Sequence, residues 1–168
     1  MIKIGKNLLE FSTYSCQPKT KDELYEIISD RIEKEGPNCD LNDIDVSLIT
    51  DMSYLFSFSN FSGDISKWNV SNVKDMSEMF SYSTFNKPIG SWNISNVKDM
   101  SYMFDNSKFN KDISNWDVSN VKNMCGVFQK SKFNKDISKW KINKDCDITD
   151  MFNECPIKEE YKPKSLQK

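Results

Sequence analysis

The sequence has no histidine, only one arginine and only five glycines among its 168 residues, and each scarcity excludes a class of function. Without histidine the chain lacks the commonest general base, the usual partner of a nucleophilic serine or cysteine, and the commonest metal ligand. So few glycines leave no Gly-rich phosphate loop and no Gly-rich calcium repeat. We therefore expect no enzyme activity, no cofactor and no bound metal.

Long hydrophobic runs are also missing. The N-terminal stretch MIKIGKNLLEF lacks an apolar core of signal-peptide length, and no segment approaches the length of a membrane span. The five cysteines are odd in number and form no CxxC pair, so neither a zinc knuckle nor a complete disulfide framework is indicated. These features predict a reduced, cytoplasmic protein without a membrane span, which would reach a cell surface only by an unrecognised route.

What the sequence does contain is a repeat with a period of 24 residues. Its most visible members are Trp68, Trp92, Trp116 and Trp140. Other apolar positions recur with the same period, among them Met52, Met76, Met100 and Met124, then Phe56, Phe80, Phe104, Phe128 and Phe152, and then Ile65, Ile89, Ile113 and Ile137. A fixed period of this length is typical of proteins built from stacked coils.

The repeat divides the chain into three parts. Residues 1–44 do not repeat and are expected to cap the first coil, with one amphipathic helix over 20–35 that begins at a Thr20/Glu23 capping box and ends before Gly36. Residues 45–155 would form a solenoid of about four and a half repeats. Residues 156–168 follow as a loose C-terminal tail.

The spacing inside each unit predicts the local structure. Apolar residues in steps of three, from Val70 through Val73 to Met76, fit neither one continuous strand nor one continuous helix. We expect a repeat solenoid that is mainly β, in which short parallel strands of successive coils pair. A helical or 3₁₀ turn is expected at Met76–Phe80.

The unit FNKDISNWDVSNVKNM, from Phe109 to Met124, with the MSYMF that closes the neighbouring coil, resembles the mycoplasma-type repeat of the BspA-like leucine-rich-repeat proteins. The lead-in segments PKTKDEL and DLNDIDVSLITDMSYLF are similar to those that precede such repeats in that family. The resemblance covers about Pro18 to Phe152. It implies a right-handed, leucine-rich-repeat-like coil used as a recognition surface, often in bacterial surface proteins and adhesins, without enzyme activity or cofactor.

Several repeated side chains suggest chemistry, and each also has a structural explanation. The tryptophans could stack on sugars, but their place between apolar columns favours packing as a structural ladder. The lysines from Lys130 to Lys144 could contact nucleic acid, yet without arginine a solvated basic end is favoured. The aspartate columns could bind calcium, but turn formation is favoured. These columns hold Asp51, Asp75, Asp99 and Asp147, and then Asp64, Asp112 and Asp136.

Positions that vary between repeats are free to serve function. One variable column holds Tyr54, Glu78, Tyr102 and Gly126, and a second, four residues later, holds Phe58, Tyr82, Asn106 and Lys130. Stacked coils would merge the columns into one stripe, and clustered aromatic residues are typical anchors of protein interfaces. The alternative, that these aromatic side chains only pack on one another across coils, stays open. The candidate partner-binding residues are Tyr54, Phe58, Glu78, Tyr82, Tyr102, Asn106 and Lys130.

Together these features predict a non-enzymatic protein–protein interaction module that presents a rigid solenoid surface to a macromolecular partner. One alternative is a small, phage-encoded inhibitor of a host or defence enzyme, and another is a surface adhesin of the BspA-like type. A protein partner is expected rather than nucleic acid. The net charge is −5 over residues 1–61 (six basic, eleven acidic) and +3 over the remainder (seventeen basic, fourteen acidic), so head-to-tail self-association is a further alternative.

Overall fold

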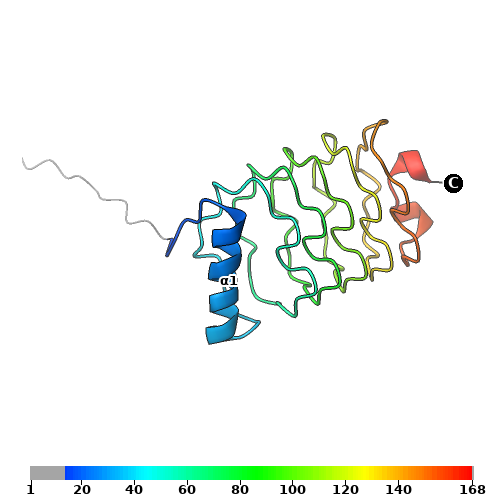
Figure 1. Cartoon of the computed structure of the whole chain (residues 1–168). Helices are drawn as coiled ribbons and strands as arrows, with labels where there is room; N and C mark the ends of the chain where they lie inside the picture. Colours follow the sequence, from blue (N-terminus) through cyan, green and yellow to red (C-terminus); the bar gives the residue numbers. More distant parts are fainter. Residues whose placement is uncertain (1–13, 168) are drawn as a thin grey trace, which may run out of the picture.

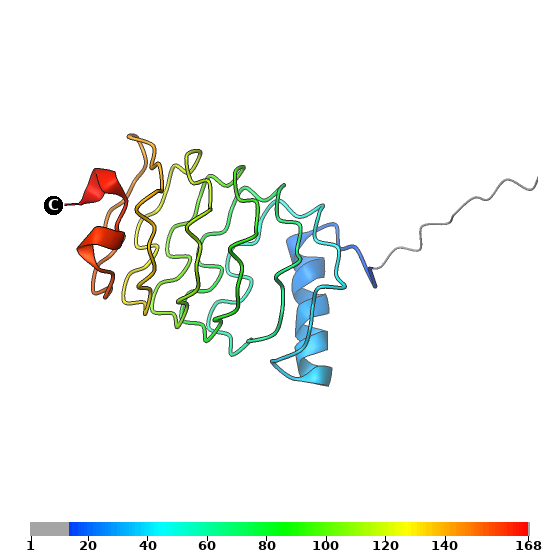
Figure 2. The ribbon, with the colours of Figure 1, turned by 180° about the vertical axis from the view of Figure 1, so that it is seen from behind.

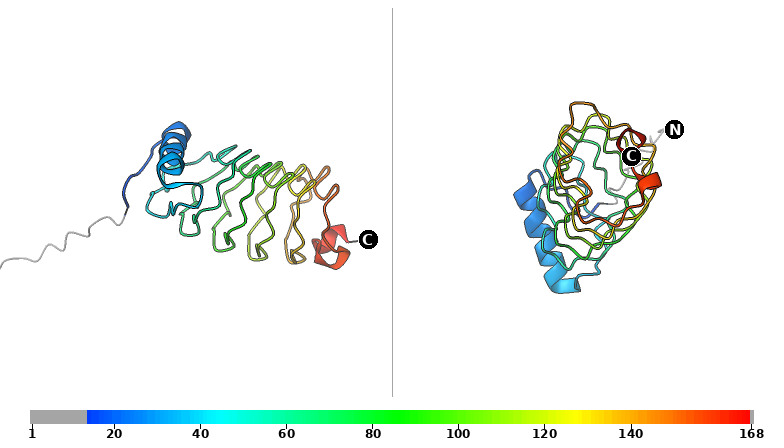
Figure 3. Two further views of the ribbon diagram at one scale, coloured as in Figure 1. Left: turned by 90° about the horizontal axis from the view of Figure 1, so that it is seen from below. Right: turned by 90° about the vertical axis from the view of Figure 1, so that its right-hand side faces the viewer.

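The computed structural model describes residues 14–167. One α-helix, α1 (Lys21–Glu35), precedes a stack of coils, and two short 3₁₀ helices, η1 (Glu159–Tyr161) and η2 (Lys164–Leu166), follow it. Figure 1 shows α1 against the N-terminal end of the stack and the 3₁₀ helices against its C-terminal end, and Figure 2 shows the stack from behind. Viewed along the stack, successive coils lie over one another (Figure 3). Neighbouring coils in the sequence are therefore neighbours in space.

Backbone hydrogen bonds connect the coils through alternate residues of one segment. In the second coil the N–H groups of residues 76, 78, 80 and 82 donate to the carbonyl groups of residues 99, 101, 103 and 105 over 2.8–2.9 Å. The intervening N–H groups fold back within the coil, as Met79 N–H donates to Met76 and Ser81 N–H donates to Glu78. The same alternation recurs in the other coils. This segment is a chain of tight turns whose alternate N–H groups hold the next coil.

The expected mainly β solenoid is therefore wrong. Within residues 14–167 parallel pairing is confined to isolated single-residue bridges, with no strand and no sheet. A paired strand must be extended, whereas here the connecting segments are tightly turned. The helical or 3₁₀ turn expected at Met76–Phe80 is also replaced by these turns. The bridges join Cys16 to Ile44, Asp40 to Asp64, and then Asp51, Asp75, Asp99, Asn123 and Asp147 in succession.

Aromatic ladders fill the interior of the stack. One consists of Phe56, Phe80, Phe104, Phe128 and Phe152, whose ring centroids are 5.6–5.9 Å apart with planes within 4° of parallel. A second, made of Phe61, Phe85, Phe109 and Phe133, stacks at 6.1–6.4 Å. Each ring of the first ladder through Phe128 also lies 4.2–4.6 Å from a ring of the second. A coil thus buries its apolar side chains against the coils on both sides.

The four tryptophans form a third ladder. Their side chains are only 3–4% exposed, and each indole N–H donates to a backbone carbonyl 27 residues earlier in the chain, over 2.8–3.2 Å. A buried indole needs such an acceptor for its N–H group. The tryptophans therefore pack as a structural ladder and present no open ring face on which a sugar could stack.

Helix α1 caps the N-terminal end of the stack. Thr20 Oγ1 accepts a hydrogen bond from the Glu23 N–H at the helix start, and Gly36, with φ of 87°, follows its last residue. The helix thus begins at Lys21, one residue later than the expected start at residue 20, and it ends at Glu35 as expected. Leu24 and Ile28 are buried against the first coil. Both face the stack because they stand four residues apart on one side of the helix.

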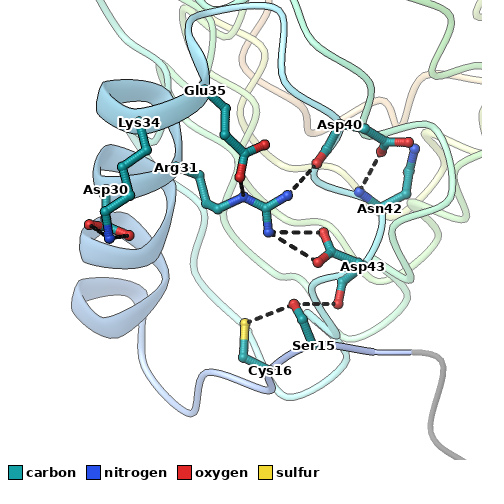
Figure 4. A network of polar contacts seen from close by, with 9 residues as sticks. All are labelled: Ser15, Cys16, Asp30, Arg31, Lys34, Glu35, Asp40, Asn42 and Asp43. Carbon is teal, nitrogen blue, oxygen red and sulfur yellow. Dashed lines mark hydrogen bonds and ion pairs between the residues drawn. The ribbon is translucent and has the colours of Figure 1, made fainter.

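A polar network anchors α1 to the segment that leads into the first coil (Figure 4). The Arg31 guanidinium forms an ion pair with Asp43 over 3.0 Å and donates to the Asp40 carbonyl, also over 3.0 Å. Ser15 Oγ donates to the Asp43 carbonyl. Hydrogen bonds from Ser15 and from the Arg31 guanidinium, together with the Arg31 charge, lower the pKa of Asp43. The chain's single arginine is thereby committed to structure.

The C-terminal segment is not the loose tail expected from the sequence. Ile157 is buried, Tyr161 accepts a hydrogen bond from the Ile137 N–H over 2.9 Å, and Lys164 N–H donates to Ser138. Lys162 lies over the Phe152 ring at 5.9 Å. Residues 157–166 therefore cover part of the last coil. Among the helices of the described chain, none is long and apolar enough to cross a membrane.

Candidate functional site

The two variable columns lie on left-handed backbone. Each of the seven candidate residues has a positive φ, and Gly126 in the first column has φ of 59°. Tyr54 is the third residue of the turn closed by the Leu55 N–H and the Met52 carbonyl, and a positive φ at that position is the mark of a type II turn. The candidate residues and their φ values are Tyr54 (62°), Phe58 (55°), Glu78 (52°), Tyr82 (53°), Tyr102 (53°), Asn106 (47°) and Lys130 (52°).

This conformation explains why these columns tolerate different side chains. The turn dictates the backbone at each position, and most of the side chains point to solvent, so the packing that fixes the apolar columns does not act here. For residues other than glycine and asparagine the left-handed conformation costs about 1–2 kcal/mol each. Strain of this kind at an exposed row of residues justifies a hypothesis of function.

The stripe predicted from the sequence divides into two parts. Near α1, the side chains of Tyr54, Phe58 and Tyr82 are 55%, 75% and 45% exposed. The Phe58 and Tyr82 rings stack with centroids 4.8 Å apart, so packing across coils and exposure to solvent occur together. The nearby Glu78 carboxylate raises the pKa of the Tyr54 hydroxyl. This part therefore exposes three large aromatic side chains, two of which are stacked.

The C-terminal part of the stripe is less available. A Cβ atom on Gly126 would lie 2.4 Å from the Tyr102 ring, so this ring rests on the glycine of the next coil. The Cys125 thiol contacts the Tyr102 hydroxyl at 3.3 Å and raises the pKa of Tyr102 to about 12. Asn106 and Lys130 are exposed, and Lys130 lies 3.9 Å from a Glu154 carboxylate oxygen. These residues do not continue the aromatic surface.

A groove between α1 and the first coil completes the aromatic surface. Tyr25, on α1, is 55% exposed. It lines both this groove, of about 530 Å³, and a smaller pocket of about 170 Å³ beside Tyr54. The sequence did not identify Tyr25, because this residue lies outside the apolar face of the helix. Only the docking of α1 brings it to the stripe. We call Tyr25, Tyr54, Phe58 and Tyr82 the aromatic patch.

The aspartate columns form turns within the coils. Asp75 Oδ1 accepts from the Ser77 N–H over 2.8 Å and from the Ser77 hydroxyl over 2.7 Å. Asp99 makes the same contacts with Ser101 and also accepts from the Asn123 side chain. No group of three or more potential metal-ligating His, Cys, Asp or Glu side chains converges within residues 14–167. The carboxylates satisfy backbone N–H groups, as an Asx turn requires.

Part of the lysine cluster lines a shallow hollow of about 540 Å³ elsewhere on the stack. Its lysines alternate with aspartates, and hydrogen bonds from Ser114 and Ser138 hold the pKa values of Asp112 and Asp136 below the ordinary range. Both carboxylates are therefore charged at neutral pH, and the surface is mixed in sign. The lining residues include Lys111, Lys135, Lys139, Asp112 and Asp136.

Asp105 is a buried carboxylate beside the stripe. It is 7% exposed, and its Oδ1 atom has no hydrogen-bond partner within the described chain. Burial raises the pKa of Asp105, and the nearby Lys130 only partly opposes this effect. Because the folded-state pKa lies above the unfolded value, the charged form costs stability at neutral pH, and this cost disappears as pH falls through the folded-state pKa.

Replacing Asp105 with asparagine is therefore expected to raise the free energy of unfolding at pH 7 by roughly 1 kcal/mol, the lower range for an unpaired buried polar atom. The gain should vanish in acid, where the wild-type carboxyl is protonated. Urea denaturation at pH 7 and at pH 3 measures both effects. Asp112→Asn is the control and should bring no gain at pH 7, because the pKa of Asp112 is lowered. Equal gains for both variants would contradict this explanation.

The structure defines a non-sheet stack of 24-residue coils with an α-helical N-terminal cap and an exposed aromatic patch beside the cap. The family described as "Mycoplasma protein of unknown function, DUF285" matches residues 28–108 and 105–160. The chain therefore belongs to this family. A search of curated proteins and a search of solved structures each gave no match.

Proposed function

We propose that the protein is a non-enzymatic interaction module that binds a partner protein through the aromatic patch. The observation that carries the proposal is the exposure of its four aromatic side chains, at 45–75%, on neighbouring elements. Large aromatic side chains are common interface anchors, and a contiguous exposed apolar surface marks an interaction site. The resemblance of the repeat to that of the BspA-like proteins, which implies a recognition surface, supports the same proposal.

The mechanism is the presentation of a preformed surface. Tyr54, Phe58 and Tyr82 stand on turns held by hydrogen bonds to the next coil, such as Phe58 N–H to the Ser81 carbonyl at 2.9 Å. Little backbone freedom is lost when a partner binds such residues, so more of the contact energy appears as affinity. An inhibitor or an adhesin would use the same surface. The identity of the captured partner, with cell fractionation for the predicted cytoplasmic location, distinguishes these roles.

Replacing Tyr54, Phe58 and Tyr82 together with asparagine is expected to weaken partner capture at least tenfold. Asparagine tolerates the left-handed backbone, so circular dichroism and the melting temperature should stay close to wild type. Capture from host lysate, quantified by mass spectrometry, provides the measurement. Leu48→Asn, which changes an exposed apolar residue outside the patch, is the control. If the triple variant retains full capture, the patch does not bind the partner.

A further inference from the structure

Two tyrosines on separate elements line one small pocket at the start of the helix cap. Tyr25 lies on α1 and Tyr54 lies in the first coil, and both border a space of about 170 Å³. Each tyrosine side chain is 55% exposed. The rest of the lining consists of Lys21, Asp22, Ser53 and Leu55.

The faces of these two rings are not occupied by other parts of the protein. Phe58 and Tyr82 stack on each other at 4.8 Å, but no aromatic ring of residues 14–167 stacks on Tyr25 or Tyr54. Lysines near the C-terminal end lie over aromatic rings at 5.0 and 5.9 Å, but in the described part of the chain none lies over either tyrosine of the pocket. Both rings can therefore receive a ligand from solvent.

The charges that line the pocket favour a cation. Lys21 is the only base in the lining, and it is already paired with Asp51 over 2.9 Å and donates to the Ser53 hydroxyl over 2.8 Å. The Asp22 carboxylate, by contrast, forms no ion pair within residues 14–167. One negative charge in the lining is thus left without a partner.

Carboxylates of the next two coils add negative charge on the Tyr54 side of the pocket. Glu78 has the largest effect and raises the pKa of the Tyr54 hydroxyl, and the charges of Asp75 and Asp99 act in the same direction. A field that opposes loss of the phenol proton also attracts a cation and repels an anion. The pocket therefore disfavours ligands that carry phosphate or carboxylate groups.

The lining also distinguishes between kinds of cation. A metal ion needs several oxygen ligands, and no group of three or more His, Cys, Asp or Glu side chains converges within residues 14–167. A primary ammonium needs hydrogen-bond acceptors, but the Ser53 hydroxyl already binds Lys21. A quaternary ammonium has no N–H group and presents methyl groups, which suit two aromatic rings and Leu55. Aromatic faces commonly bind such groups in proteins.

We propose that this pocket binds a small quaternary ammonium compound of the choline type. The trimethylammonium group lies between the rings of Tyr25 and Tyr54, and Asp22 contributes negative charge at the rim. Phosphocholine binds more weakly than choline, because the same carboxylates repel its phosphate. The proposal goes beyond the proposed function, since it needs only two residues of the aromatic patch and no partner protein.

Isothermal titration of the full chain with choline tests the proposal. The matched control ligand is the neutral alcohol in which carbon replaces the choline nitrogen, so that shape is kept and charge is lost. Choline should bind saturably, and the alcohol should bind at least about fivefold more weakly, as expected when a cation–π interaction is lost. Equal binding of the two ligands, or no saturable binding of choline, would overturn the proposal.

Variants of the lining residues test the site. Tyr25→Leu and Tyr54→Asn should each weaken choline binding about fivefold. Leucine favours a helix and asparagine tolerates left-handed backbone, so both variants should keep the wild-type circular dichroism spectrum. Asp22→Asn should weaken binding about twofold. Glu33→Gln, which removes the same charge from α1 outside the pocket, should not. Wild-type affinity in both tyrosine variants would show that choline does not bind there.

NMR of the choline methyl protons locates the ligand. Nuclear Overhauser contacts should join these protons to the ring protons of Tyr25 and Tyr54, and contacts confined to Phe58 and Tyr82 would overturn the assignment. A peptide with trimethyl-lysine that binds far more tightly than choline would identify a modified protein as the ligand and reject the small compound. Loss of partner capture by the patch variant, without choline binding to the wild type, would retain the proposed function and reject only this site.

Discussion

Phe104→Ala is expected to lower the free energy of unfolding by about 3–5 kcal/mol. The ring is fully buried and lies 4.3 Å from the Phe109 ring and 5.7 Å from the rings of Phe80 and Phe128. Its removal leaves a cavity bounded by side chains of three coils. Since hydrogen bonds between coils hold those walls in place, the cavity should collapse only partly, which places the cost in the upper range. Urea denaturation measures the change.

Phe152→Ala provides the matched control. Phe152 occupies the same ladder in the last coil, but it is only partly buried and stacks on a single neighbour in that ladder, Phe128, at 5.9 Å. The expected loss is about 1–2 kcal/mol, because the site opens to solvent and can relax. Equal losses for Phe104→Ala and Phe152→Ala would show that stacking on both sides does not determine the stability of a coil.

Gly63→Ala is expected to cost about 3 kcal/mol through a backbone collision. A Cβ atom at this position would lie 1.8 Å from the Cys39 carbonyl oxygen. This oxygen belongs to the backbone, so no side-chain rotation can relieve the collision. The neighbouring Ser62 N–H donates to Pro37 over 2.7 Å, so the segment after α1 cannot move away without loss of this bond. Thermal unfolding and hydrogen exchange of residues 37–44 should both report loosening of the cap.

Gly36→Ala separates this collision from backbone strain. Gly36 has φ of 87°, but a Cβ atom there would meet no atom within 4 Å. Only the conformational cost applies, roughly 1–3 kcal/mol, because φ of 87° with ψ of 170° is a region that essentially only glycine occupies. A loss for Gly63→Ala no larger than that for Gly36→Ala would contradict the steric explanation.

The sequence predicts the core well because the buried positions recur with the same 24-residue period as the sequence. The phenylalanine and tryptophan columns are apolar in every unit, and those columns are the ladders inside the stack. The helix was predictable because Thr20, Glu23 and Gly36 form local capping signals that act within a few residues. The β assignment failed because apolar spacing does not report φ. The available signals were Gly126 and Asn106, residues that favour left-handed backbone, in columns otherwise filled by larger side chains.

The candidate site depends on contacts that no local pattern encodes. The variable columns identified Tyr54, Phe58 and Tyr82, but not that Tyr102 rests on Gly126. Tyr25 joins the patch only through the docking of α1 on the first coil. Likewise, no backbone N–H of residues 14–167 donates to the carbonyls of Asp51, Ser53, Leu55 and Ser57, because no equivalent segment precedes them in the ladder. Both depend on the arrangement of whole elements.

The turn segments are electrically polar along the stack, although other N–H groups, such as those of Lys74 and Thr84, donate in the opposite direction. At alternate positions of each coil, N–H groups point toward the C-terminal end and carbonyl groups toward the N-terminal end. Aligned peptide groups add their dipoles, as they do in an α-helix. Helix α1, which carries six acidic and three basic side chains, lies at the negative pole of these segments. Backbone and side chains therefore generate fields of the same sense, which should steer a cationic partner toward the α1 end before any contact forms.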